Sequence, residues 1–585
     1  MACIKCGGPT KNGESLCEKC SGKDTSSIPP DEINGKRPKK LKRTLIALAA
    51  IFVVLIGIVS IGKFFFNRDF MELIQGKTRY VQNIELAMAK SSISQMVDCL
   101  DTSDNLSKGY SEHKALDSTL QLNVKVEDQL LKDMNLSAEE SESIQRTVKY
   151  LNSLKIDTKT FADDNGARAS FILTDPSALN LTVDLLRYND GKTYLHIPQI
   201  HEKYIPIEDQ KTASQFNPYD LSKIKYDPAK LKASLGKLAI IYSNSFSAAE
   251  IKAENNQSIT IDGVTVQGQK LTASLTPAKI SAMLKAIAKA AKNDNYLYTF
   301  VSDNYDLFSS IAGSPAQSSS KKLTKEDYGK LIDEFLSNTD LEKDGVNFSA
   351  ISYLSQNGTL LAHSYESNDK TDKRQLNYLI ADKKYAVEFL MDQKNGFTFT
   401  NTKTGEGAGK LQLKIQSEEY PKNTGITVDY SGCRTVSFLG SDVMVGKYVI
   451  SLYDPDHELN RYVQQAGLPE SFNKLDQLSI RIETATDSDK LDSTVQLSMP
   501  GILSISMIGK TGAASKSASI QPRIEPSQVL DFSTGESKEA MNELSMGEIK
   551  FLSKTLGKDP ELKAVLSGLG VSKEQLDMII ALSQS

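Results

Sequence analysis

The chain has 585 residues, of which 39% are hydrophobic and 24% charged, and its formal net charge is −4. A chain of this length can form several hydrophobic cores, and its near-neutral balance argues against a nucleic-acid-binding protein. Tryptophan is absent, so no sugar-binding surface built on indole stacking is expected.

Four cysteines near the N-terminus follow the pattern C-x2-C-x10-C-x2-C, namely Cys3, Cys6, Cys17 and Cys20. Each C-x-x-C turn directs two thiolates toward one point, and four thiolates satisfy the tetrahedral geometry of structural zinc. About twenty residues cannot bury a core, so the metal would supply the folding free energy. The sequence therefore predicts a structural Zn²⁺ site in residues 1–21, followed by a flexible basic linker over 22–43. Redox chemistry is the alternative, but the βαβ pattern that usually carries it is missing.

The segment 44–62 contains nineteen residues without a charge, about the length that a helix needs to cross a bilayer. Six of the eight residues before it are basic, which favours a cytoplasmic N-terminus and an extracytoplasmic remainder. A cleaved signal peptide and a buried core helix are the alternatives. The length of the apolar run and its basic flank favour an uncleaved, single-pass membrane helix.

Residues 63–113 are predicted to be helical, because apolar residues such as Phe70, Ile74 and Val81 recur at three- and four-residue steps. This helix is either a juxtamembrane stalk or a first helix packed on the following domain.

Residues 114–274 are predicted to form a first β-rich unit. Leu120, Leu122 and Val124 alternate with polar residues, as in a strand with one solvated face. A helix over 137–152 interrupts the strands, and hairpin turns are predicted at 189–191 and 262–263.

A helical block is predicted over 275–340, where Thr276 precedes a first-turn proline and Thr324 with Asp327 begins a further helix. It is the natural cover for the apolar face of the strands. The alternating pattern returns over 341–530, with a hairpin at Asn357-Gly358, and predicts a second β-rich unit. Residues 531–585 are predicted to be helical, with Ser572 and Gln575 as a capping box.

The predicted fold class is therefore α+β: a four-cysteine zinc ribbon, one transmembrane helix, and a large extracytoplasmic region of curved antiparallel sheet with a helical block. The two strand-rich segments form either two units or one large sheet.

Two family resemblances add to this interpretation. The cysteine pattern resembles the zinc ribbons at the N-termini of many bacterial membrane proteins. The long meanders, and above all Tyr188 to Ile207, resemble the half-barrel domains of envelope lipoproteins of the LolA/LppX-like class. The second resemblance implies a curved sheet whose helices enclose a hydrophobic cavity for lipid or lipoprotein.

Three short motifs resemble the signature of penicillin-binding serine enzymes: S-x-x-K at Ser234 and Lys237, S-D-N from Ser302, and K-T-G from Lys403. In that family the region between the last two motifs is mainly helical, whereas residues 346–400 are predicted to be strands. The same motifs also recur elsewhere in this chain, so the enzyme is the alternative.

Other candidate sites are weaker. His196 and His201 could meet a metal, and the acidic turn at Asp454 to His457 lacks the regular ligand spacing of a calcium loop. Cys99 and Cys433 either pair or remain buried free thiols.

These features predict a non-enzymatic envelope protein of a bacterium, anchored in the cell membrane. Its zinc ribbon would dock a cytoplasmic protein, while its outer domain binds a lipid, a cell-wall component or a protein. No nucleic acid is expected as a partner, and a cell-wall-acting serine enzyme is the alternative function.

Overall fold

The computed structural model describes residues 68–581 except for short gaps. These gaps are 112–114, 164, 208–223, 306–307, 309–322, 338–344, 369–372, 382, 392–394, 418–423, 467–469, 488, 515–519, 521–522 and 531–536.

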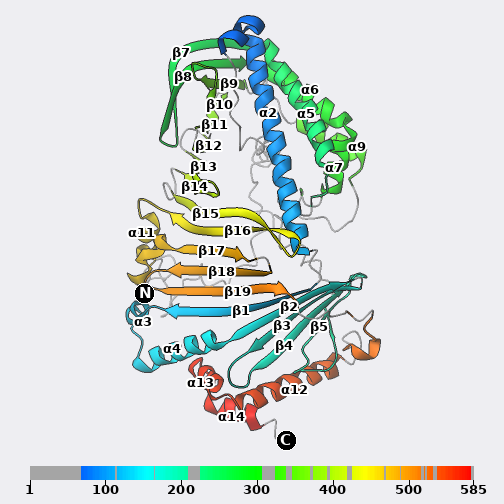
Figure 1. Ribbon diagram of the computed structural model, residues 1–585, viewed down its shortest axis with the longest axis vertical. Coiled ribbons are helices and arrows are strands. Elements are labelled where there is room, and N and C mark those ends of the chain that lie inside the picture. The colour runs from blue at the N-terminus through cyan, green and yellow to red at the C-terminus, as the bar shows by residue number, and fades with distance from the viewer. Residues whose placement is uncertain are drawn as a thin grey trace, which may run out of the picture.

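The described residues form one sheet of 19 strands, in which all neighbouring strands are antiparallel (Figure 1). The strands are β1 (Ala115–Val126), β2 (Lys155–Asp163), β3 (Gly166–Thr174), β4 (Asn180–Tyr188), β5 (Thr193–His196), β6 (Ile205–Ile207), β7 (Glu250–Ile261), β8 (Val264–Leu275), β9 (Asn347–Leu354), β10 (Leu360–Asn368), β11 (Lys373–Ile380), β12 (Lys384–Met391), β13 (Asn395–Gly405), β14 (Ala408–Gln416), β15 (Thr424–Phe438), β16 (Ser441–Tyr453), β17 (Ser479–Thr486), β18 (Lys490–Met499) and β19 (Leu503–Ala513).

Helices cover the two ends of this sheet. The α-helices of the described part are α2 (Arg68–Ser111), α3 (Asp128–Asp133), α4 (Ala138–Ser153), α5 (Pro228–Ser245), α6 (Pro277–Asn293), α7 (Asn295–Asp303), α9 (Lys325–Ser337), α11 (Glu458–Gln465), α12 (Ser537–Leu556), α13 (Pro560–Gly568) and α14 (Lys573–Ala581). Short 3-10 turns are η3 (Phe246–Ala248), η4 (Glu470–Gln477) and η5 (Pro526–Gln528).

The first and last strands lie side by side in the interior of the sheet. From β1 the chain meanders through β2 to β6, which forms one edge. It then continues at the opposite edge with β7 and meanders back until β19 pairs with β1 over eleven positions, from Leu116↔Ala513 to Val126↔Leu503. We call the β1–β19 pair the seam. Because every other strand pair among the described residues is sequential, the seam is the one strand pairing in this part that joins the two meanders.

The long helix α2 packs on one face of the sheet, which we call the inner face. Tyr80, Ile84 and Met88 of α2 are buried in a core with Leu271 of β8 and Leu354 of β9. Figure 1 shows α2 running from this core, near the top of the view, to the ends of β15 and β16. Helix α5 packs beside it, where Lys232 forms an ion pair with Asp98, and Tyr226, just before α5, donates a hydrogen bond to Asp101.

The opposite, outer face of β9 to β12 is covered as well. The β7–β8 hairpin folds across it, so that Ile261 is buried against Ile351, Leu379 and Ala386. The turn residue Asp262 holds the tip of this hairpin, since its carboxylate lies 2.6 Å from Lys384 Nζ and 2.5 Å from Lys414 Nζ. The upper part of the sheet, β8 to β12, is therefore buried on both faces.

At the lower end the C-terminal segment covers the outer face of β3 to β5. Leu186 and Tyr188 are buried with Ile520 and Ile524. Helices α12, α13 and α14 lie beyond these strands (Figure 1). Tyr150 of α4 donates to Asp175 (2.9 Å) and to Asp559 at the start of α13 (3.3 Å), which ties α4 to the C-terminal helices.

The predicted fold class is wrong for the described chain. It includes a transmembrane helix, whereas no helix among the described residues is long and apolar enough to cross a membrane. The strands form one large sheet, which is one of the two arrangements that the sequence allowed. No group of three or more His, Cys, Asp or Glu in this part could hold a metal ion. The predicted zinc ribbon (Cys3, Cys6, Cys17, Cys20) and membrane helix (44–62) lie outside the described residues. The cellular location and the cytoplasmic partner stay predictions.

Several local predictions are confirmed. The capping boxes form, with Asp327 N donating to Thr324 Oγ1 (3.1 Å) and Gln575 N to Ser572 Oγ (3.2 Å). The predicted helix in 63–113 is a packed helix rather than a free stalk. Helix α5 has no counterpart among the predictions, although Asp227 followed by Pro228 is a strong start signal, and Asp227 does cap the helix.

Candidate functional site

The inner face continues from the upper core into the middle of the sheet, from β14 through the seam to β3. Directly paired residues of antiparallel strands point to the same face, so the register identifies its side chains. One cross-strand row of aliphatic residues runs through seven strands: Leu411, Val428, Ile450, Ile480, Leu497, Ile505 and Val124. A second row beside it contains Ile482, Val495, Met507 and Leu122.

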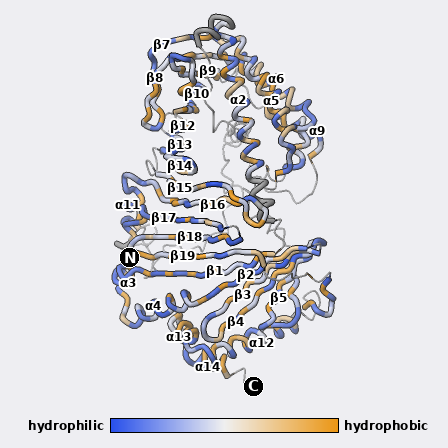
Figure 2. Tube along the Cα trace, in the orientation of Figure 1, coloured by the Kyte–Doolittle hydropathy of each residue, from blue (hydrophilic) through white to orange (hydrophobic). Residues whose placement is uncertain are grey.

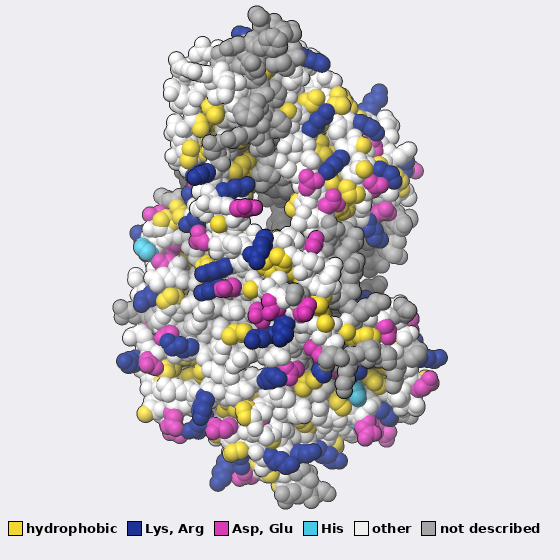
Figure 3. All heavy atoms as spheres, in the orientation of Figure 1, with side chains coloured by type: hydrophobic (Ala, Val, Ile, Leu, Met, Phe, Trp, Pro, Cys, Tyr) yellow, Lys and Arg dark blue, Asp and Glu magenta, His cyan; other side chains and the backbone are white. Residues whose placement is uncertain are grey.

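In the described register this middle part of the inner face carries one charged strand residue between β14 and β3, the exposed Asp442 near the start of β16, and no Lys or Arg. The outer face is the opposite in character. Lys410, Asp429, Arg481 and Asp492 all point outward, and Figure 3 shows side chains of both charge signs over β15 to β19. The alternation of hydrophobic and hydrophilic residues along these strands is visible in Figure 2. The outer face of the middle sheet is therefore hydrophilic, and the inner face is apolar.

The apolar side chains of the middle inner face remain accessible. Ile415, Ile426 and Met507 are 50%, 45% and 43% exposed, and Val495 is 39% exposed. In the upper part, by contrast, Leu271 and Leu354 on the same face are almost fully buried. Because contiguous apolar surface is rarely left open in a soluble domain, this area is a candidate binding surface.

A sealed polar cluster lies where α2 meets the upper sheet. Glu85 of α2 accepts hydrogen bonds from Tyr242 (2.7 Å) and Tyr365 (3.1 Å), and His363 Nε2 lies 3.4 Å from its other oxygen. Burial raises the pKa of Glu85 to about 7, although the two tyrosine hydroxyls oppose the rise. Burial also lowers the pKa of His363 to about 3. Both side chains are fully buried, so they anchor α2 rather than meet a substrate.

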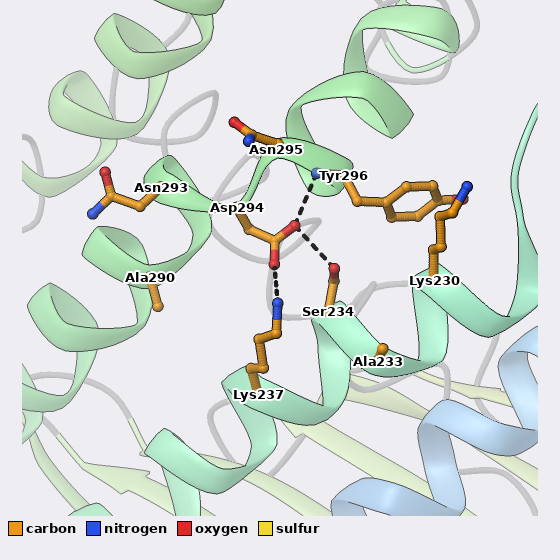
Figure 4. Close-up of a pocket in the computed structure, with 9 residues that line it drawn as sticks. All are labelled: Lys230, Ala233, Ser234, Lys237, Ala290, Asn293, Asp294, Asn295 and Tyr296. Atoms are coloured by element: carbon orange, nitrogen blue, oxygen red, sulfur yellow. Dashed lines mark hydrogen bonds and ion pairs between the residues drawn. The ribbon is translucent and has the colours of Figure 1, made fainter.

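The two residues of the S-x-x-K motif do come together. Ser234 and Lys237 lie one helical turn apart on α5 and line a shallow pocket of about 540 Å³ (Figure 4). Ser234 Oγ donates to Asp294 Oδ1 (2.9 Å), and Lys237 Nζ lies 3.1 Å from Asp294 Oδ2.

Asp294 explains this arrangement as helix capping. Its carboxylate accepts the backbone amides of Tyr296 and Leu297 at the start of α7. Burial opposes ionisation of Asp294, but the Leu297 amide, Lys237 and Ser234 hold its pKa below the usual range. A lysine paired with an ionised carboxylate is a poor base for activating serine, so the pair joins α5 to α7.

The other motif residues have different neighbours. Ser302 donates a hydrogen bond to the Leu323 carbonyl (3.0 Å). Asn304 of the same motif accepts a hydrogen bond from the Lys225 amide and donates one to the Lys225 carbonyl. Lys403 lies near the end of the internal strand β13 and is paired with Gly409 of β14. The described contacts therefore do not bring the three motifs into one catalytic site.

The weaker candidates also have structural roles. His196 stacks on Tyr204, with ring centroids 4.5 Å apart, and His201 Nε2 lies 3.1 Å from Glu543. Asp454 caps α11 by accepting the amides of residues 458 and 459. Cys99 and Cys433 are both free, and Cys99 is exposed rather than buried as predicted.

The predicted site residues do not include those of the open inner face. Their signal is the alternation of apolar and polar residues within 341–530, which predicts strands but not which face of the sheet stays open. No protein-family model matches the chain, and no curated protein matches its sequence.

Proposed function

We propose that this chain is a non-enzymatic lipid-binding protein that holds acyl chains on the open inner face between β14 and β3. One observation carries the proposal: across nine neighbouring strands this face has no Lys or Arg and a single acid, Asp442 at the end of the β15–β16 hairpin, while its aliphatic side chains stay accessible. The predicted resemblance to lipid-holding half-barrel domains points the same way.

The energetics favour an apolar occupant over water. Fully burying a Val, Leu or Ile side chain contributes about 1.5–3 kcal/mol, so each half-exposed residue leaves on the order of 1 kcal/mol unrealised. An acyl chain recovers this free energy without needing hydrogen-bond partners, which the aliphatic rows do not offer.

The dimensions also suit lipid tails. Neighbouring strands lie about 4.8 Å apart, so nine strands extend roughly 38 Å across the face. A bilayer core of about 30 Å contains two leaflets, so one tail spans about 15 Å. The face is therefore long enough for two tails placed end to end.

Photocrosslinking in cells that express the full chain tests the proposal. A benzophenone amino acid replaces Ile426 or Val495 on the inner face, and Asp429 or Thr494 on the outer face of the same strands. The cells receive a radiolabelled fatty acid before irradiation, and the label on the purified chain is counted. We expect label at both inner positions and background at both outer positions.

Two results would overturn the proposal. Equal labelling of inner and outer positions would mean that the contact is unspecific. A crosslink from Ile426 or Val495 to another polypeptide, seen as a large mass increase without label, would instead assign the face to a protein partner.

A further inference from the structure

The inner face contains one polar island among its aliphatic rows. We call it the hydroxyl patch, and it consists of Thr484, Thr486, Ser493, Thr511, Ser118, Thr158 and Thr160. The register places these residues on the inner face of β17, β18, β19, β1 and β2, with Ser118 opposite both Thr511 and Thr158. Thr484 lies opposite Ser493 in the same way.

The patch borders the aliphatic rows directly. Residues two apart in a strand share a face and are separated by about 7 Å. Val495 therefore lies next to Ser493, and Ile482 next to Thr484. On the other side, Leu173 and Leu185 of β3 and β4 continue the apolar surface. A ligand whose tail follows the aliphatic rows would place its headgroup over the hydroxyl patch.

The hydroxyl groups keep hydrogen-bonding capacity for such a headgroup. Ser118 Oγ and Thr511 Oγ1 are 2.9 Å apart, and only one of the two can donate to the other. The proton of the accepting hydroxyl stays available, and each oxygen retains a lone pair. The hydroxyl of Thr486 already donates to the Lys490 carbonyl, and that of Thr484 to the carbonyls of Met444 and Gly446. Toward a headgroup, these two oxygens can therefore only accept hydrogen bonds.

The patch offers no charge. Lys and Arg are absent from the inner face of β14 to β3 as far as the described register defines it, whereas the outer face of the same strands has several. A phosphate group set against this patch would give up hydration without gaining a cationic partner, which is costly. Glycerol and sugar hydroxyls would exchange hydrogen bonds with water for hydrogen bonds with the patch at little cost.

We infer that the bound lipid has an uncharged, hydroxylated headgroup, which lies on the hydroxyl patch while its tails occupy the aliphatic rows. The inference rests on the proposed lipid binding and adds the substrate class.

Competition between two lipids tests it. The full chain is incubated with vesicles that contain radiolabelled monoglucosyl diacylglycerol and phosphatidylglycerol with identical tails, and the lipid retained after removal of the vesicles is measured. We expect the neutral glycolipid to be retained in roughly tenfold excess over the anionic lipid. The double variant Thr158→Val/Thr160→Val keeps the side-chain volume and the β propensity, and should bring the ratio close to one without reducing total lipid. Thr494→Val, on the outer face, should leave the ratio unchanged.

The outcomes separate the two proposals. Equal retention, or a preference for phosphatidylglycerol in the unmodified chain, would refute the headgroup assignment and leave acyl-chain binding intact. Retention of neither lipid would refute both. Because the unmodified chain decides each case, a variant that fails to fold does not obscure the result.

Discussion

The upper and middle parts of the sheet share one face but differ in what covers it. Around β8 to β12, α2 and α6 bury the inner face and the β7–β8 hairpin buries the outer face. Between β14 and β3 the same face continues with Leu, Ile, Val and Met, yet these side chains are accessible. Apolar and polar residues alternate along the strands in both parts. Whether the inner face becomes a core or a binding surface therefore depends on which elements pack against it.

The largest expected effect comes from truncating matched leucines in the two parts. Leu354→Ala removes a fully buried side chain and should cost about 2–5 kcal/mol, whereas Leu413→Ala, 37% exposed, should cost about 1–2 kcal/mol. Guanidinium unfolding of the full chain, followed by circular dichroism, measures both. Equal destabilisation would mean that the middle face is as tightly covered as the upper core.

The anchor of α2 contains two buried groups, Glu85 and His363, whose ionisation changes stability in opposite directions as pH rises. The pKa of Glu85 is raised to about 7 in the folded chain, so its stabilising contribution is complete below the unfolded pKa near 4.5 and is lost as pH rises through about 7. At about 1.4 kcal/mol per pH unit, the loss from Glu85 alone amounts to roughly 3 kcal/mol, but the lowered pKa of His363 acts in the opposite direction and offsets most of it between about pH 4.5 and 6.5 in the unmodified chain.

Glu85→Gln should abolish this loss while keeping the shape of the side chain. His363, whose pKa is lowered to about 3, then determines the pH dependence of stability, which should fall as pH drops below about 6.5. Melting temperatures recorded between pH 4 and pH 8 for both chains provide the measurement. An unchanged profile in the variant would show that Glu85 is ionised in the fold.

The cover of the outer face can be loosened separately. Asp262→Asn keeps a residue that tolerates the positive φ of 48° at this position but removes the charge that meets Lys384 and Lys414. We expect a loss of about 1–3 kcal/mol and faster proteolysis of the β7–β8 hairpin, with acyl-chain binding retained. Loss of binding would show that the two parts are coupled.

The smallest effect is expected at the serine–lysine pocket. Lys237 is largely exposed, so Lys237→Ala should change stability by less than about 1 kcal/mol. A fluorescent β-lactam should leave the unmodified chain and the Ser234→Ala variant equally unlabelled. An adduct that depends on Ser234 would restore the serine-enzyme alternative.

The sequence predicted local structure better than its arrangement. Alternation identified most strands and their apolar side, and Asn357-Gly358 formed the expected hairpin, because both signals depend on residues close in the chain. The pairing of β1 with β19 leaves no such signal. Glu85 could not be recognised as buried, since a lone acid in a helix ordinarily faces solvent. The open face required knowing which strands the helices leave uncovered.

The seam also constrains how the molecule is made. Ser118 and Thr511 are neighbours in space but 393 residues apart in the chain. At about 5–20 residues per second, a ribosome needs roughly 20–80 s to deliver the partner of β1. During that interval one edge of β1 lacks its final partner, β19. Folding of the nascent chain therefore depends on a late, long-range strand pairing that joins the two meanders.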